Sequence, residues 1–202
     1  MSALLDQRVL LGMSQAHVAF LLGSKQPNIS AYETQDAEYG SLVADRVEAF
    51  CQLEVETIHR GTWLGTCASH AQQLRAWVKS FTGAEDERDH FLLRYIINMN
   101  DAFMQALEHG APSADLAFFL IPPGSTGDES IDALFAGLGV HWARVMGAER
   151  SPHWTRGGAV DAMWWPGLPE SAPTLRAEAF VHAVPSLKAR GIIVNRNTLA
   201  SV

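Results

Sequence analysis

Cysteine is scarce in this sequence, and so are long apolar runs. Only Cys51 and Cys67 occur among 202 residues, too few for a disulfide framework and typical of a reduced cytosolic protein. No stretch holds the roughly 18 consecutive apolar residues that a membrane span needs, and Asp6 interrupts the short apolar N-terminus, which is therefore not typical of a signal peptide. We expect a soluble cytoplasmic protein that makes no contact with a membrane.

Patterns that carry catalysis, metals or cofactors are also missing. Serine and histidine occur near one another without a nucleophile elbow, and no glycine-rich phosphate loop is present. Two cysteines and two histidines are close enough in sequence to suggest zinc, but their spacing fits neither a finger nor a ribbon: Cys51, His59, Cys67 and His70. We therefore expect no enzyme, no bound metal and no cofactor.

Apolar residues, by contrast, are abundant. Hydrophobic residues make up 48% of the chain and charged residues 18%, which is typical of a folded protein and excludes a disordered one. The net charge of −7 divides unevenly: residues 1–60 carry −4, residues 61–140 carry −6 and residues 141–202 carry +3. The last third is where a polyanion attracted by charge alone would bind.

Apolar residues recur at helical spacing along the first sixty residues. A first helix should bury Leu4, Val9, Leu10 and Met13. A second begins after Ser14, a good N-cap, and ends at Gly23, which tolerates a positive φ. A third covers residues 26–34 with Pro27 in its first turn, where a missing N–H costs nothing. A polar loop and a fourth helix over residues 42–58 follow.

The remainder of the chain also has a mainly helical pattern. Helices are predicted around residues 74–81, 91–109, 130–146 and 174–183, with an acidic loop at 83–89 and a short helix opened by Pro185. Residues 117–121 fit a buried strand or one helical turn, and residues 192–194 fit an edge strand. The predicted fold class is mostly α: an N-terminal helical bundle and a mainly helical C-terminal domain with room for a short strand or two.

One stretch, residues 12–33, is more specific than the rest. Its helix, its turn at Gly23 and its second helix have the spacing of a helix-turn-helix. It resembles the Cro/phage-repressor type of helix-turn-helix domain, the XRE family. The matching positions are Arg8, Ser14-Gln15, Ala19, Leu22-Gly23, Gln26, Ile29-Ser30 and Tyr32-Glu33. Lys25, Ala31 and Gln35 depart from residues common in that family.

The resemblance implies that the second helix enters the major groove of double-stranded DNA. If Ile29 is buried, a rotation of about 100° per residue turns Pro27, Ala31 and Thr34 outward, with Asn28 and Ser30 on the flanks. Gln26 would approach base edges, and Gln15 would contact a phosphate and support Gln26. Lys25 is expected to contact a phosphate.

These observations predict a sequence-specific transcriptional regulator, most simply a repressor. Residues 1–60 would form the DNA-binding domain, and residues 61–202 would serve dimerisation or sensing. A homodimer is expected because apolar faces at residues 91–107 and 131–145 exceed what one thin layer buries. The alternative is an antitoxin that represses its own operon and holds a toxin through the C-terminal domain.

The partner of the C-terminal domain stays open at this level. Four tryptophans fall in the basic last third, namely Trp142, Trp154, Trp164 and Trp165. Tryptophan buries a large area, so these residues could simply close a small core. They could also form a site for a partner protein or a small-molecule effector.

Overall fold

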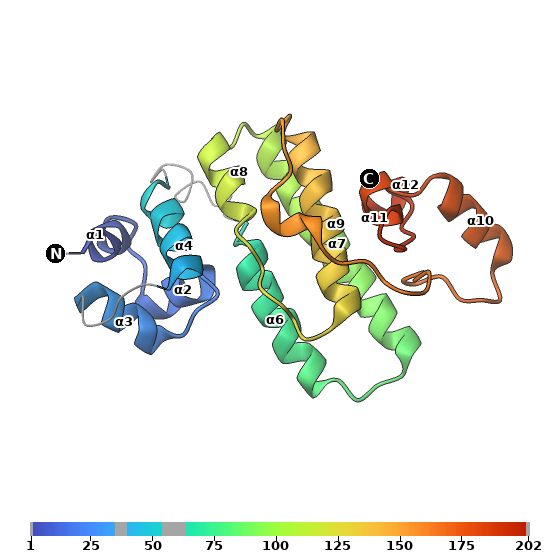
Figure 1. Ribbon diagram of the computed structural model, residues 1–202, viewed down its shortest axis with the longest axis horizontal. Coiled ribbons are helices and arrows are strands. Elements are labelled where there is room, and N and C mark those ends of the chain that lie inside the picture. The colour runs from blue at the N-terminus through green and yellow to red at the C-terminus, as the bar shows by residue number, and fades with distance from the viewer. Residues whose placement is uncertain (1, 35–39, 54–63, 201–202) are drawn as a thin grey trace. The chain divides into compact units, whose positions relative to one another are not determined.

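The computed structural model describes residues 2–34, 40–53 and 64–200, and this part of the chain is mostly helical (Figure 1), which confirms the predicted fold class. It divides into two compact units. Unit 1 comprises Met1–Gln73 and Ala106–Gly124, and unit 2 comprises Leu74–Gln105 and Ser125–Val202. The predicted domain boundary after residue 60 lies outside the described residues and stays a prediction.

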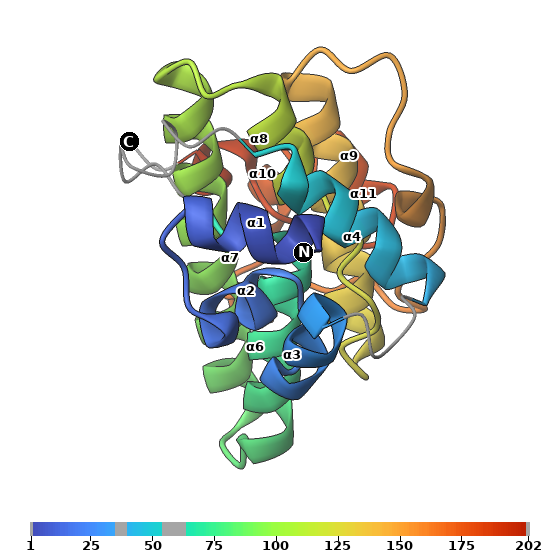
Figure 2. The same cartoon turned by 90° about the vertical axis from the view of Figure 1, so that its left-hand side faces the viewer.

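Unit 1 begins with four short helices: α1 (Ala3–Leu10), α2 (Gln15–Leu21), α3 (Gln26–Thr34) and α4 (Ser41–Cys51). Figure 2 turns this unit toward the viewer: α1 lies across the front, α4 lies beside it, and α2 and α3 lie below. Serine N-caps begin the first two helices. Ser2 Oγ accepts from the Leu5 N–H, and Ser14 Oγ, the N-cap that the sequence predicted, accepts from the His17 N–H.

The core of unit 1 draws on residues well beyond position 60. Ala68 of α6 (Cys67–Ser80), together with Phe118 and Ile121 in and after α8 (Ser113–Phe119), packs with apolar side chains of the first four helices. Buried Arg46 ties the same parts together by donating to the carbonyls of Leu22 and Pro122. Because α8 ends at Phe119, the run at residues 117–121, which the sequence left open between strand and helix, is helical over most of its length.

The buried face of α1 differs from the predicted one. Leu4 is buried as expected and so is Met13, but Val9 and Leu10 are 64% and 61% exposed. The inward positions include Gln7, whose Nε2 donates to the carbonyl of Leu53 at 3.0 Å. Gln7 can lie on the buried side of α1 because its amide bonds to the Leu53 carbonyl. Val9 and Leu10, which the sequence predicted to be buried, face solvent instead.

Unit 2 is built around α7 (Glu85–Glu108) and α9 (Glu129–Val145), followed by the short helices η1 (His153–Arg156), α10 (Pro173–Val181), α11 (Pro185–Lys188) and α12 (Arg196–Leu199). The indole of Trp142 is buried and donates to Asn100 Oδ1 at 2.9 Å. Gly139 lets Trp154 approach α9 so closely that an added Cβ would lie 2.6 Å from its ring. These two tryptophans close the core.

Three helix boundaries and the strand differ from expectation. The α6 helix begins at Cys67, seven residues before the predicted start at residue 74. The α7 helix begins at Glu85, inside the predicted acidic loop, because carboxylates in a first turn favour the helix dipole. The α4 helix ends at Cys51, and the predicted continuation to residue 58 runs into undescribed residues. In place of a strand at 192–194, the described chain has isolated bridges, which pair Trp164 with Ile192 and Ala183 with Asn195.

The apolar faces that suggested a dimer are largely buried within the chain itself. On α7 the buried side chains include Leu92, Ile96 and Phe103, and on α9 they run from Ile131 to Ala143. Phe91 and Val145 are the large apolar residues of these two segments that reach 38% and 36% exposure. These faces therefore no longer argue for a dimer, and the homodimer stays a prediction that needs other support.

Candidate nucleic-acid interface

A tight turn joins α2 to α3 and fixes the angle at which they meet. The Ser24 N–H donates to the Ala19 carbonyl and the Gly23 N–H to the Phe20 carbonyl, while Gly23 has a φ of 60°. This is the glycine-terminated pattern that closes a helix and satisfies its last carbonyls. The helix end predicted at Gly23 is confirmed, and a residue with a Cβ there would meet Ala68 at 3.1 Å.

The α3 helix buries one side and presents the other. Ile29 has no exposed surface, as the sequence predicted. The predicted DNA-contacting side chains fall into two groups. Those that are exposed are Lys25, Gln26, Pro27, Asn28 and Thr34, and those that are half-buried are Gln15, Ser30 and Ala31.

A chain of hydrogen bonds runs from the interior of unit 1 to the exposed start of α3. Arg8 donates through Nε to Glu33 Oε1 at 2.5 Å and through Nη2 to Oε2 at 3.1 Å. Gln15 Nε2 donates to Glu33 Oε2 at 2.8 Å. Gln26 Nε2 in turn donates to Gln15 Oε1 at 2.8 Å. Three of the four side chains therefore serve to hold the fourth, Gln26, at the surface.

The order of donors along this chain is fixed by chemistry. An ionised carboxylate only accepts, so Gln15 must turn its NH₂ toward Glu33 and its oxygen toward Gln26. Gln26 must then present its NH₂ to Gln15, and this bond uses one of its two N–H groups. The remaining N–H and the Oε1 of Gln26 form a donor and acceptor pair of fixed orientation on an exposed side chain.

The electrostatics of Glu33 keep this network charged. Burial alone would raise the pKa of Glu33, but the hydrogen bonds from Arg8 and Gln15 and the charge of Arg8 outweigh it, so the pKa lies below its ordinary value. The hydrogen bond to Glu33 raises the pKa of Arg8 despite some desolvation. Both groups therefore stay ionised near neutral pH, which the fixed donor order requires.

Two predicted contact residues also bond within unit 1. The Thr34 hydroxyl lies 3.1 Å from the carbonyls of both Ser30 and Ala31, to which it can donate. Asn28 Nδ2 donates to Ser24 Oγ at 3.4 Å, a long bond that is easily exchanged for another partner. Asn28 is thus the more adaptable of the two.

Arg8 and Glu33 fit the family pattern in the sequence, but that pattern predicted no role for either residue. Glu33 closes α3 yet is only 7% exposed, and Arg8 also donates to the Met13 carbonyl at 3.0 Å. The sequence did contain a signal for this ion pair. Glu33 lies on the same side of its helix as buried Ile29, and it needs a cationic partner because a buried charge is costly when unpaired. Arg8 is the arginine of the first predicted helix.

The described residues include no group of three histidine, cysteine, aspartate or glutamate side chains that could hold a metal ion. His59, one of the four possible zinc ligands in the sequence, lies outside the described residues. Cys67 is buried, which raises the pKa of its thiol, and the His70 ring bonds to the Leu64 carbonyl. No helix in the described part of the chain is long and apolar enough to cross a membrane.

Comparisons with protein-family models, with curated proteins and with solved structures gave no match.

Proposed function

We propose that this protein binds double-stranded DNA in a sequence-specific manner and regulates transcription, most simply as a repressor. The observation that carries the proposal is the oriented amide of Gln26, which the bonds from Arg8 through Glu33 and Gln15 hold at the exposed start of α3. The four side chains form one continuous chain of hydrogen bonds that ends at an exposed amide. Their effect is to present one donor and one acceptor in a fixed direction.

The free N–H and the Oε1 of Gln26 form a donor and acceptor pair that complements adenine. Gln or Asn reads adenine by donating to N7 and accepting from the N6 amino group, and Gln26 retains one N–H and its Oε1 for this purpose. Asn28 is exposed and can form the same pair, and Pro27 or Ala31 can contact a thymine methyl group. Because the outward residues of α3 include no Arg or Lys, we expect A·T pairs at the central contacted positions of each half-site.

Contacts between this protein and the phosphate backbone of the DNA would be few. The cations of the described part of unit 1 are Arg8, Lys25 and Arg46, of which Arg8 binds Glu33 and Arg46 binds backbone carbonyls. Lys25 is exposed beside the start of α3 and is the cation placed to meet a phosphate, with the Gln15 side chain as a neutral second contact. Affinity per monomer would be modest, with a shallow dependence on salt.

Two copies of α3 on an inverted repeat would compensate for this weakness. One helix of nine residues reaches only a few base pairs, whereas a homodimer places two such helices about 34 Å apart on one face of the duplex. The proposal therefore includes a homodimer and operator half-sites separated by about one helical turn.

Selection of bound sequences from a random duplex library tests the proposal. The full-length chain should enrich half-sites with central A·T pairs. On the selected duplex, Gln26→Ala or Asn28→Ala should lose about 1 to 3 kcal/mol of binding free energy, and much less on random DNA. Lys25→Ala should weaken both alike, because a phosphate contact carries no sequence information.

Gln52→Ala is the matched control, since Gln52 is exposed at the end of α4 and lies outside α2 and α3. It should bind the selected duplex as the unmodified chain does. Enrichment of G·C-rich half-sites, or a Gln26→Ala variant whose preference is unchanged, would contradict the proposed readout.

A further inference from the structure

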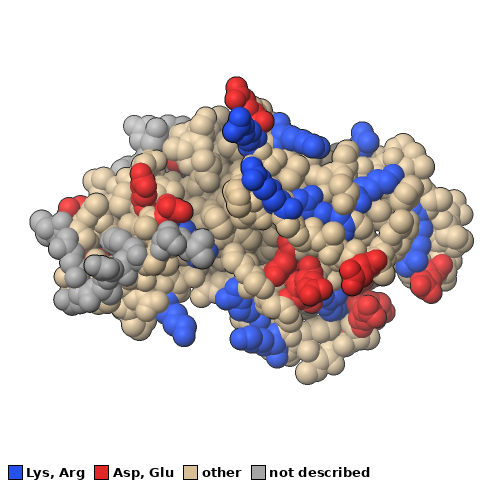
Figure 3. Space-filling view, in the orientation of Figure 1, with Lys and Arg blue, Asp and Glu red and all other residues tan. Residues whose placement is uncertain are grey.

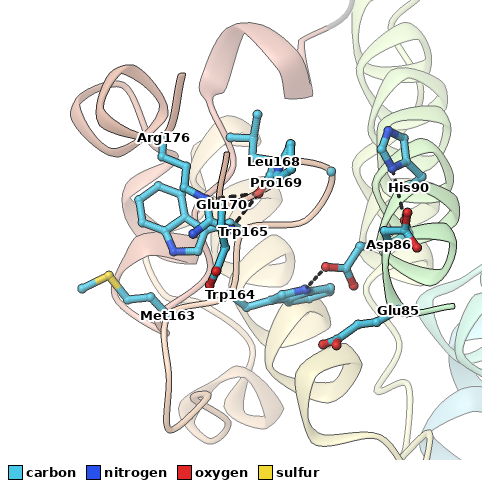
Figure 4. Close-up of a pocket in the computed structure, with 12 residues that line it drawn as sticks. Glu85, Asp86, His90, Met163, Trp164, Trp165, Leu168, Pro169, Glu170 and Arg176 are labelled. Carbon is cyan, nitrogen blue, oxygen red and sulfur yellow. Dashed lines mark hydrogen bonds between the residues drawn. The ribbon is translucent and has the colours of Figure 1, made fainter. Parts of the chain in front are cut away.

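Unit 2 contains a cavity that DNA binding leaves unexplained. It has a volume of about 790 Å³ and lies between the first turns of α7 and the chain at residues 163–170, with Arg176 of α10 completing the wall (Figure 4). This volume falls in the range of small-molecule sites, roughly 300 to 1,000 Å³. The cavity can therefore hold a compact organic molecule.

The apolar part of the lining combines two indole rings, which are held in place, with Met163, Leu168 and Pro169. Trp164 donates through its indole N–H to Asp89 Oδ2 at 2.9 Å, and its backbone bonds to Gly191 and Ile193 on either side. Trp165 packs against the small cluster of Ala179, Ala183 and Ile193. The rings are thus positioned before any ligand arrives, and this lowers the entropic cost of binding.

Both indole rings already have a guanidinium over a face. Arg88 lies 5.8 Å from the centroid of Trp164, and Arg176 lies 5.2 Å from that of Trp165. Aromatic faces attract cations because their electron density is negative above the ring. Arg176 is also anchored, since its Nε and Nη2 both donate to the Leu168 carbonyl.

The polar part of the lining is predominantly acidic. It includes Glu85, Asp86 and Asp89 from α7 and Glu170 from the facing chain, against the single arginine Arg176. Asp89 binds Trp164 and Arg88, whereas the other three acidic residues are exposed. Figure 3 shows the wider setting: acidic side chains gather where α7 and α9 begin. The cavity should therefore repel anions and attract cations.

We propose that this cavity binds an organic cation with an apolar body, an amine or quaternary ammonium compound of small-molecule size. The indoles and Met163 would contact the apolar body, and Glu85, Asp86 and Glu170 would surround the charge. A bare metal ion fits less well, because large aromatic walls offer it no ligands. The proposal does not depend on DNA binding, so each can fail without the other.

Calorimetric titration of the full-length chain with benzyltrimethylammonium tests it. Benzyl alcohol, which is neutral, and phenylacetate, which is an anion, have the same ring and serve as comparison probes. We expect saturable binding of the cation at least about tenfold tighter than that of the alcohol, weakening as salt is added, and no detectable binding of phenylacetate. Equal affinity for all three probes, or tighter binding of the anion, would overturn the proposal.

Exposed carboxylates on opposite walls allow a matched pair of variants. The double variant Glu85→Gln with Glu170→Gln should bind the cation about fivefold more weakly or worse. The control, Glu87→Gln with Glu178→Gln, changes charge equally on α7 and α10 outside the lining and should stay within about twofold of the unmodified chain. All four residues are exposed, and circular dichroism checks that both variants fold. Equal loss in the two variants would refute the assigned site.

Discussion

Two arginine and carboxylate pairs, one in each unit, have the same shortest distance and serve different ends. Arg8 and Glu33 approach to 2.5 Å, as do Arg88 and Asp128. Glu33 is 4% exposed at its side chain and also accepts from Gln15, whereas Asp128 is 18% exposed and also caps α9. The buried carboxylate of Glu33 fixes the orientation of the Gln15 amide, which in turn orients the exposed amide of Gln26. Asp128, the more exposed of the two carboxylates, caps α9, and we expect its ion pair to contribute less.

Removing the buried carboxylate should have the largest effect. Glu33→Ala leaves Arg8 and Gln15 without their acceptor in a low-dielectric setting, and we expect the free energy of unfolding to fall by about 2 to 4 kcal/mol. Urea unfolding of the full chain measures it. A loss below about 1 kcal/mol would mean that water replaces Glu33, and the distinction between the two pairs would disappear.

The same pair should make stability depend on pH. Because the folded-state pKa of Glu33 is lowered, its stabilising contribution is fully present above its ordinary pKa of 4.5 and is lost as the pH falls through the lower folded value. The stability difference between the unmodified chain and Glu33→Gln should therefore be constant between pH 6 and 7 and shrink below about pH 4.5. A difference that grows on acidification would reverse the assigned sign.

Glycine substitution tests the turn that sets α2 against α3. At both Gly12 and Gly23 φ is positive, but an added Cβ meets nothing within 4 Å at Gly12 and lies 3.1 to 3.3 Å from Ala68 and Arg46 at Gly23. We expect Gly12→Ala to cost about 1 kcal/mol for backbone strain and Gly23→Ala about 2 kcal/mol for strain and crowding. Thermal unfolding of both variants compares them. Equal costs would show that crowding at Gly23 relaxes freely.

The smallest effect should come from Arg88 and Asp128 in unit 2, the more exposed of the two pairs. Asp128→Asn removes the charge facing Arg88 but keeps an oxygen able to accept from the Ser130 and Ile131 N–H groups. It should cost less than about 1 kcal/mol, and Asp128→Ala about 1 kcal/mol more because the cap is lost. If the two variants are equally destabilised, the cap contributes nothing and the ion pair matters more than its exposure indicates.

Local signals in the sequence predicted the segment from Ser14 to Thr34 closely. A serine N-cap, a glycine with positive φ and a proline in a first turn each act within a few residues, so spacing alone is sufficient. The sequence also predicted that Ile29 is buried and that Gln26 is exposed, as the structure shows.

Features that depend on distant partners could not be predicted in the same way. Gln7 is buried because the Leu53 carbonyl accepts its amide, and Asn100 because it bonds to Trp142 and to the Leu199 carbonyl. The cavity in unit 2 needs α7 to begin at Glu85, opposite residues more than seventy positions away. Periodicity carries no information on such pairings.

Replacement of single adenines tests most directly whether the network from Arg8 orients Gln26 to read adenine. On the duplex selected by the full-length chain, each central adenine is replaced in turn by 7-deazaadenine, which lacks only the N7 acceptor. At the contacted position the unmodified protein should lose about 2- to 13-fold in affinity, because one of the two hydrogen bonds to adenine is removed, while Gln26→Ala should bind both duplexes equally. Equal losses for the two proteins, or no loss at any central adenine, would contradict the claim.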